Sequence, residues 1–183
     1  MKLSVIIVSF NVKSYLRQCL NSVLASTHID DLEVIVVDNH SFDDSCDLVK
    51  NEFPQIELIE NQKNLGFSVA INQGINIASG DYICFLNPDT LIQEDAFIKL
   101  ISHLEENPKV GCIGPKILNP DGSLQKSCKR SFPTPLVALP KILGLSRMSP
   151  KSKWFGKYNL TYLDENKSHI VDAISGSFML FPN

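Results

Sequence analysis

The stretch "YICFLNPDT" (residues 82–90) shows how this chain is organised. Its first five residues are apolar, which is typical of a strand that is covered on both faces of a sheet. The run then stops abruptly at Asn87, Pro88 and Asp89. These residue types are typical of a turn, yet a carboxylate held beside a strand end is also suited to a hard divalent cation.

The same organisation repeats along the first two thirds of the chain. Strand-like runs lie at 3–10, 33–38, 56–60, 82–86 and 110–118, and helical segments lie between them at 12–26, 43–53, 66–79 and 94–107. Strands that alternate with helices indicate an α/β fold with a mainly parallel central sheet flanked by helices.

The alternation stops at the turn signal Asn119–Gly122. We therefore expect an α/β region over 1–121, followed over 122–183 by the start of a second region with loops and a short helix near 136–145. The length of 183 residues suits a single domain overall.

Charge is distributed unevenly. Residues 1–121 carry 17 acidic and 8 basic side chains, which does not suit a nucleic-acid partner. Residues 122–163 carry 8 basic and no acidic side chains. This basic stretch suits phosphate or an anionic membrane surface, unless it is simply a solvated loop.

The five cysteines are odd in number, and none form a C-x-x-C pair. We therefore expect free thiols and a cytoplasmic location. The apolar run 3–10 is too short for a signal core or a membrane span. The chain has no G-x-G-x-x-G after its first strand and no P-loop motif, which disfavours dehydrogenases and P-loop NTPases.

Polar residues follow four of the predicted strands, at Ser9–Asn11, Asp38–Asn39, Asn61–Asn64 and Asn87–Asp89. The carboxyl ends of parallel strands meet at one edge of a sheet, where ligands bind. Asp38 is suited to accept a hydrogen bond from a nucleobase imide or a ribose hydroxyl, or it is a turn residue. Gly66 opens a helix, where it either lets a phosphate approach the backbone or is a simple cap.

Four segments together resemble the family 2 glycosyltransferases, most closely their bacterial rhamnosyltransferase-like branch: VIIVSFN (5–11), EVIVVDNHSFDDS (33–45), NLGFSVAINQGINIASGDYICFLNPDT (64–90) and VDAISGSFMLF (171–181). The resemblance implies the A-type fold of nucleotide-diphospho-sugar transferases. It also implies an inverting enzyme that moves a sugar from a nucleoside-diphosphate sugar to a hydroxyl of a glycan or lipid-linked acceptor in cell-surface polysaccharide synthesis.

The resemblance also implies roles for individual residues. Asn87–Pro88–Asp89 takes the place of the family's Asp-x-Asp motif, so Asp89 would bind Mg²⁺ or Mn²⁺ with the donor diphosphate. Asp172 would lie near the acceptor and is the candidate catalytic residue. The implied donor-binding residues are Ser9, Asn11, Asp38, Asn39, Asn64, Gly66, Asp81 and Asn87.

Similar proteins continue to a Glu-Asp motif that supplies the general base, and this sequence stops at Asn183 before such a motif. We therefore expect a C-terminally truncated transferase in which Asp172 is the remaining substitute. The alternative is a non-catalytic or degenerate nucleotide-sugar-binding fragment. The basic and apolar stretch 126–157 either touches the inner face of the cell membrane or packs on the domain.

Overall fold

The structure is a computed structural model that describes residues 1–27, 29–148 and 151–183. The chain forms two compact units, Met1–Ile113 with Gly176–Asn183, and Gly114–Ser175. The boundary expected after residue 121 therefore falls inside the second unit, and the C-terminal residues return to the first.

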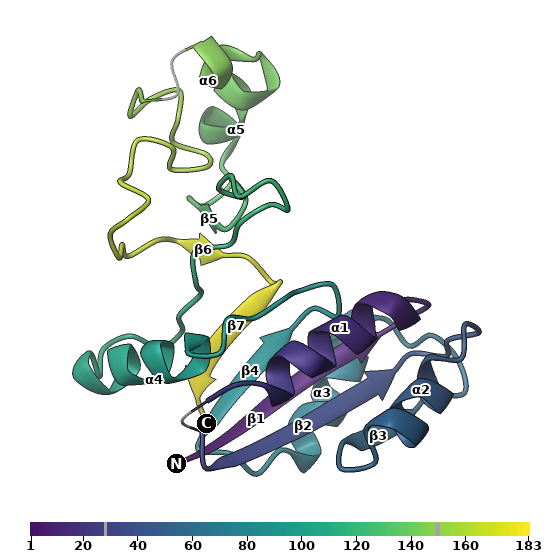
Figure 1. Ribbon diagram of the computed structural model, residues 1–183. Helices are drawn as coiled ribbons and strands as arrows, with labels where there is room; N and C mark the ends of the chain where they lie inside the picture. The colour runs from purple at the N-terminus through teal and green to yellow at the C-terminus, as the bar shows by residue number, and fades with distance from the viewer. Residues whose placement is uncertain (28, 149–150) are drawn as a thin grey trace. The chain divides into compact units, whose positions relative to one another are not determined.

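The first unit is built on a five-stranded sheet in the order β3-β2-β1-β4-β7 (Figure 1). The strands are β1 (Lys2–Ser9), β2 (Asp31–Asp38), β3 (Glu57–Glu60), β4 (Tyr82–Leu86) and β7 (Phe178–Pro182). The first four are parallel, and only β7 runs antiparallel, beside β4. This arrangement confirms the predicted α/β fold with a mainly parallel sheet.

Helices cover both faces of this sheet. They are α1 (Lys13–Leu24), α2 (Ser45–Glu52), α3 (Phe67–Ile77) and α4 (Ala96–Glu106). Val5 and Ile7 of β1 belong to the core cluster that contains α1, α2 and α4 side chains, whereas Ile6 belongs to the cluster with α3. Because both faces of β1 are covered, its sequence is apolar almost throughout instead of alternating.

A glycine within α3 allows this helix to approach the sheet closely. A Cβ atom on Gly74 would overlap the side chain of Ile6 in β1. Glycine is a poor helix former, so its presence at position 74 is explained by the contact that it permits.

The prediction of a strand at 110–118 is wrong. In this segment Ile113 forms a single bridge with Leu180, and Leu118 forms another with Leu124. The position beside β4 is taken by β7. Gly111, Gly114 and Pro115 also interrupt the segment, and proline has no N–H to donate to a ladder.

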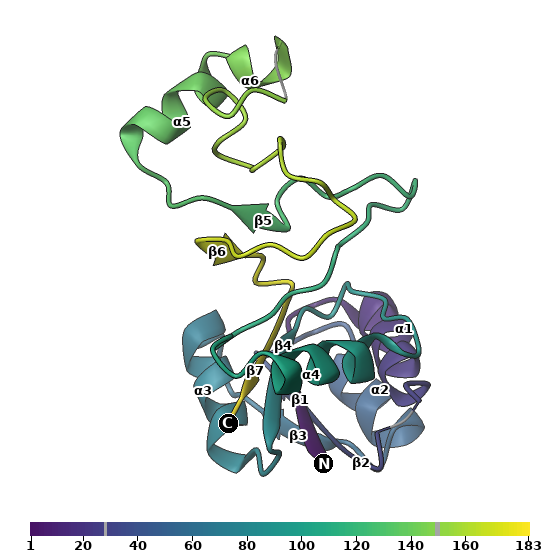
Figure 2. The same ribbon diagram turned by 90° about the vertical axis from the view of Figure 1, so that its left-hand side faces the viewer.

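The second unit contains little regular structure. Its strands β5 (Lys129–Arg130) and β6 (Ala173–Ile174) pair antiparallel, as Figure 2 shows. The short helix predicted near 136–145 is instead two helices, α5 (Pro135–Ile142) and α6 (Leu145–Met148). Gly144 separates them with a φ of +76°, which ends a helix. Among the described residues, no helix is long and apolar enough to cross a membrane.

Candidate functional site

The carboxyl ends of β1, β2 and β3 meet at one edge of the sheet. Ser9 and Asp38 are partners in the register of β1 and β2. The N–H of Asn39 donates to the carbonyl of Ser9 at 2.8 Å, and that of Asn61 donates to the carbonyl of Asp38 at 2.9 Å. The polar residues that follow these three strands are thus adjacent, as the sequence predicts.

Two buried oxygen atoms at this edge lack partners. Ser9 is 0% exposed and Asp38 is 2% exposed. Neither Ser9 Oγ nor Asp38 Oδ1 has a hydrogen-bond partner within the part of the chain that the structure describes. The other carboxylate oxygen, Asp38 Oδ2, accepts from the N–H of Ser41 at 2.8 Å. Because buried polar atoms normally find partners, these two oxygens are unusual among the polar atoms of this edge.

The thiols next to this edge are not activated nucleophiles. Burial raises the pKa of Cys46 to about 12, and the carboxylates of Asp38 and Glu60 add to the shift. Burial also raises the pKa of Cys19 to about 12, with a further contribution from Asp89. Both side chains are therefore neutral thiols near pH 7, and thiolate chemistry is disfavoured.

Hydrogen bonds join the loop after β1 to the loop after β2. The N–H of Asn11 donates to Ser41 Oγ at 2.9 Å, and Asn11 Oδ1 accepts from the N–H of Phe42 at 2.8 Å. Asn11 has a φ of +53°, in the left-handed region that asparagine tolerates. The side chain of Asn11, predicted to bind the donor, thus supports the loop beside Asp38.

Asp43 also joins the loop after β1 to the loop after β2 by hydrogen bonds. The sequence did not indicate this role. α1 begins without a side-chain cap of its own. Asp43 Oδ2 instead accepts from the N–H of Lys13, the first residue of α1, at 2.8 Å, while Asp43 Oδ1 accepts from Ser45. These bonds lower the pKa of Asp43 although partial burial opposes the shift. The acidic pair before α2 was the available signal, but it pointed only to capping of α2.

Asn39 belongs to a network of side-chain amides. Asn39 Oδ1 accepts from the N–H of Leu65 at 2.9 Å and from Asn61 Nδ2 at 3.3 Å. Asn61 and Gln73 of α3 exchange two hydrogen bonds, at 2.9 and 2.8 Å. Asn39 is 3% exposed. Its side chain therefore holds the loop 61–66 against the sheet edge. Asn39 would affect a bound ligand by positioning that loop and not by direct contact.

Gly66 presents the start of α3 to open space. Asn64 Oδ1 accepts from Asn39 Nδ2 and from the N–H of Gly66, both at 2.9 Å. Gly66 has a φ of +81°, and apart from its chain neighbours no atom of the described residues lies within 4 Å of the position that a Cβ would take. An accessible helix N-terminus is suited to a phosphate group, and glycine permits the close approach of the backbone.

The loop after β4 forms a turn that leaves Asp89 exposed. The N–H of Asn87 donates to the carbonyl of Ser177 at 2.9 Å, and the N–H of Thr90 donates to the carbonyl of Asn87 at 3.2 Å. Asp89 is thus both a turn residue and an exposed carboxylate. Across the described residues, no three His, Cys, Asp or Glu side chains gather as a metal site.

Two predicted residues belong to other parts of the chain: Asp81 to the other edge of the sheet and Asp172 to the second unit. Asp81 precedes β4, and its Oδ2 accepts from the N–H of Lys2 at 2.9 Å, at the amino end of β1. Asp81 is therefore at the opposite edge of the sheet from Asp38. Asp172 belongs to the second unit, where its Oδ2 accepts from the N–H of Phe132 at 2.9 Å.

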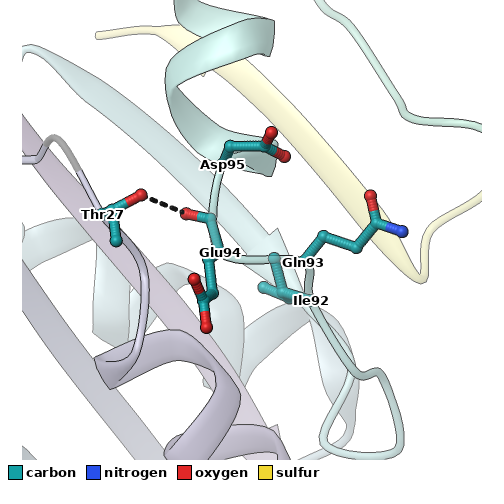
Figure 3. A pocket seen from close by; sticks show the side chains of 5 residues that line it. All are labelled: Thr27, Ile92, Gln93, Glu94 and Asp95. Atoms are coloured by element: carbon teal, nitrogen blue, oxygen red, sulfur yellow. Dashed lines mark hydrogen bonds between the residues drawn. The ribbon is translucent and has the colours of Figure 1, made fainter.

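An open hollow of about 600 Å³ lies near the end of α1 (Figure 3). The loop after Asn87 runs along α1, because the N–H of Ile92 donates to Ser22 Oγ at 3.2 Å and the N–H of Thr27 donates to the carbonyl of Glu94 at 2.9 Å. The hollow is lined by Thr27, Ile92, Gln93, Glu94 and Asp95. It contains none of the predicted site residues.

Solved structures define the class of this fold. TarS of S. aureus (fragment 1–349) aligns with a TM-score of 0.60 at 22% identity, over 75% of this chain and 40% of that one. A mannosyltransferase of Pyrobaculum calidifontis, solved with GDP-Man and Mn²⁺, aligns with a TM-score of 0.59 at 24% identity, over 66% and 36% of the two chains. The chain has the A-type glycosyltransferase fold.

The sequence matches the profile of Glycosyl transferase family 2 over residues 4–181, and the chain belongs to this family. Glycosyltransferase GlyA of Streptococcus pneumoniae is 38% identical over 97 residues, which are 51% of this chain and 14% of that protein. A poly-beta-1,6-N-acetyl-D-glucosamine synthase of Staphylococcus aureus is 30% identical over 128 residues, which are 66% of this chain and 30% of that protein. The chain thus spans less than a third of these relatives.

Proposed function

We propose that this chain binds a nucleoside-diphosphate sugar at the carboxyl edge of its sheet and serves in the transfer of that sugar to a hydroxyl group. The observation that carries the proposal is the pair of buried, unpartnered oxygens on Ser9 and Asp38 at adjacent strand ends. Related folds support it, since TarS was solved with UDP-GlcNAc and the mannosyltransferase with GDP-Man.

The nucleoside binds beside Asp38. A carboxylate only accepts hydrogen bonds, so Asp38 Oδ1 takes an N–H donor of the base, such as the ring N–H of uracil, thymine or guanine. Ser9 Oγ, next to it in the register, takes a second polar atom of the nucleoside. Phe10 and Phe42, 44% and 75% exposed in the two loops at this edge, offer ring faces on which a base can stack.

The diphosphate lies between the start of α3 and the loop after β4. The backbone at Gly66 would contact phosphate oxygens, and Asp89 would be the residue that holds Mg²⁺ or Mn²⁺ beside the diphosphate. The bound cation supplies neutralisation of the leaving group's charge. Asn87 is neutral, so this site has one carboxylate fewer than an Asp-x-Asp motif.

The transfer is an inverting displacement. The acceptor hydroxyl attacks the anomeric carbon, the bond from that carbon to the diphosphate oxygen breaks, and the hydroxyl proton passes to a base. We assign the base role to Asp172, whose carboxylate has a second oxygen beyond the one that the N–H of Phe132 occupies. The acceptor is a glycan or a lipid-linked glycan of cell-surface polysaccharide synthesis, at the inner face of the cell membrane.

Thermal unfolding of the 183-residue chain with UDP, dTDP, GDP or CDP, each with and without Mn²⁺, tests donor binding. A nucleotide at about 100 times its Kd should stabilise the fold by about 2.7 kcal/mol. We expect a shift with at least one of these nucleotides. Absence of a shift with every nucleotide would contradict the donor site.

A substitution of Asp89 tests the proposed metal site. Asp89→Ala should abolish the Mn²⁺-dependent part of the shift and retain the metal-independent part. Asp31→Ala is the matched control, because Asp31 is an exposed carboxylate at the amino end of β2, the opposite edge of the sheet. If Asp89→Ala and Asp31→Ala behave alike, Asp89 does not bind the metal.

A further inference from the structure

Helix α5 exposes its apolar stripe. Leu136 and Leu139 lie in α5, and Leu143 follows directly after it, where its N–H donates to the carbonyl of Leu139 at 2.9 Å. The three leucines have the spacing of one side of a helix. These leucines, here called the leucine face, are 83%, 50% and 62% exposed. Val137 is less exposed than they are, so the helix turns its leucine-rich side to solvent. An exposed apolar face of this kind indicates a contact surface.

The second unit also exposes a large aromatic side chain and several cations. Trp154 is 84% exposed. Lys151 and Lys153 beside it in the sequence are also exposed. All 8 charged side chains of residues 122–163 are basic.

The positive charge of residues 122–163 favours one kind of partner over another. Two copies of this segment placed face to face would bring like charges together, which opposes self-association through it. An anionic lipid surface attracts the same cations and accepts the apolar side chains between its headgroups.

We propose that the leucine face and Trp154 dock on the surface of an anionic lipid bilayer. Docking places leucine and tryptophan side chains at the depth of the headgroups, while the lysines contact lipid phosphates. This inference names the surface through which the proposed membrane contact is made, and it does not depend on donor binding.

The test is flotation of the 183-residue chain with vesicles of phosphatidylcholine alone or mixed with phosphatidylglycerol. We expect binding to the mixed vesicles only, and less binding as salt is raised. Trp154 is the only tryptophan of the chain, so its fluorescence should shift to shorter wavelength on binding. Equal binding to both vesicles, no binding, or binding without that shift would overturn the proposal.

Variants separate docking from simple charge adsorption. Replacing Leu136, Leu139 and Leu143 by Gln should lower the partition coefficient at least about tenfold. Ile77→Gln is the matched control, since Ile77 is 45% exposed on α3, and it should leave partitioning unchanged. Unchanged partitioning of the leucine variant would show adsorption by charge alone and would overturn the proposal.

Two further measurements complete the test. The leucine variant should keep the nucleotide-induced thermal shift of the parent chain, which distinguishes a failure of docking from a failure of the donor site. If the variant does not fold, Lys151→Ser with Lys153→Ser should still weaken binding to the mixed vesicles. A dimer in sedimentation that the leucine variant abolishes, without vesicle binding by the parent, would assign the face to a second copy instead.

Discussion

At the scale of single residues, Asp38 combines a structural bond with an open acceptor. One oxygen holds the N–H of Ser41, and the other has no partner among the described residues. The sequence predicted a polar residue at this strand end. It did not predict that one oxygen would accept from Ser41 while the other is buried without a partner among the described residues, because both depend on the folded chain.

We expect Asp38→Asn to weaken nucleotide binding without unfolding the protein. The side-chain amide of the variant would present its N–H to the N–H of the base, so the hydrogen bond is lost and the two groups repel each other. The affinity for the nucleotide should therefore fall at least tenfold, about 1.4 kcal/mol. The free energy of unfolding should stay within about 1 kcal/mol, because the change removes a buried charge. Calorimetric titration with the responsive nucleotide measures the first effect and urea unfolding the second. Wild-type affinity in Asp38→Asn would contradict the role of Asp38, with Asp31→Asn as control.

Glu33 offers a test of pH-dependent stability away from the site. Partial burial acts to raise the pKa of Glu33, but hydrogen bonds from Ser4 and Ser79 and the charge of Lys2 outweigh it, and the net pKa is lowered below 4.5. A carboxylate with a lowered pKa stabilises the fold above its ordinary pKa, and this stabilisation is lost as pH falls through the lowered pKa.

Glu33→Gln should therefore reduce the free energy of unfolding by about 1–2 kcal/mol at pH 7, and the difference from wild type should shrink steadily below about pH 4.5. Urea unfolding at a series of pH values measures this. Glu106→Gln, an exposed substitution at the end of α4, should show no such trend. A constant difference at all pH values would mean that the charge of Glu33 is not responsible.

At the scale of elements, the loop 61–66 is held by amides that come from three places in the chain. Asn39 follows β2, Asn61 follows β3, and Gln73 lies in α3. Helical periodicity predicts α3 but assigns no partner to Gln73, because that partner belongs to another element. The false strand at 110–118 has the same origin, since only the folded sheet shows that β7 occupies its place.

Gln73→Leu should destabilise the protein by about 1–3 kcal/mol, because it leaves the buried amide of Asn61 without its two bonds to residue 73. Amide exchange at Leu65, whose N–H is held by Asn39, should also accelerate. Asn72→Leu, exposed on the same helix, is the control and should change neither. A Gln73→Leu protein as stable as the control would show that the network carries no stability.

At the scale of the whole molecule, the two units differ in how much core they contain. The two hydrophobic clusters lie in the first unit. In the described part of the second unit, only Cys128 and Leu160 are buried hydrophobic residues. The units should therefore differ in local stability.

Hydrogen exchange should resolve this difference. Amides in β1, β2 and β4 should exchange through global unfolding, while those in the β5–β6 pair should exchange at least about tenfold faster through local opening. Mass spectrometry of peptic peptides measures both sets in one experiment. Equal protection of the two sets would mean that the second unit is stabilised by more than its own described core.

The sequence by itself determined the order of most helices and strands, the parallel character of the sheet, and the polar edge where β1, β2 and β3 end. These follow from hydrophobic periodicity and turn residues, which act over a few positions. Only the tertiary structure decided that Asp81 lies at the opposite edge, that Asn11 and Asn39 support loops, and that one oxygen each of Ser9 and Asp38 has no hydrogen-bond partner in the part of the chain that the structure describes. The physical reason is that several hydrogen bonds at this edge join residues 25 to 31 positions apart, where no local pattern in the sequence specifies the pairing.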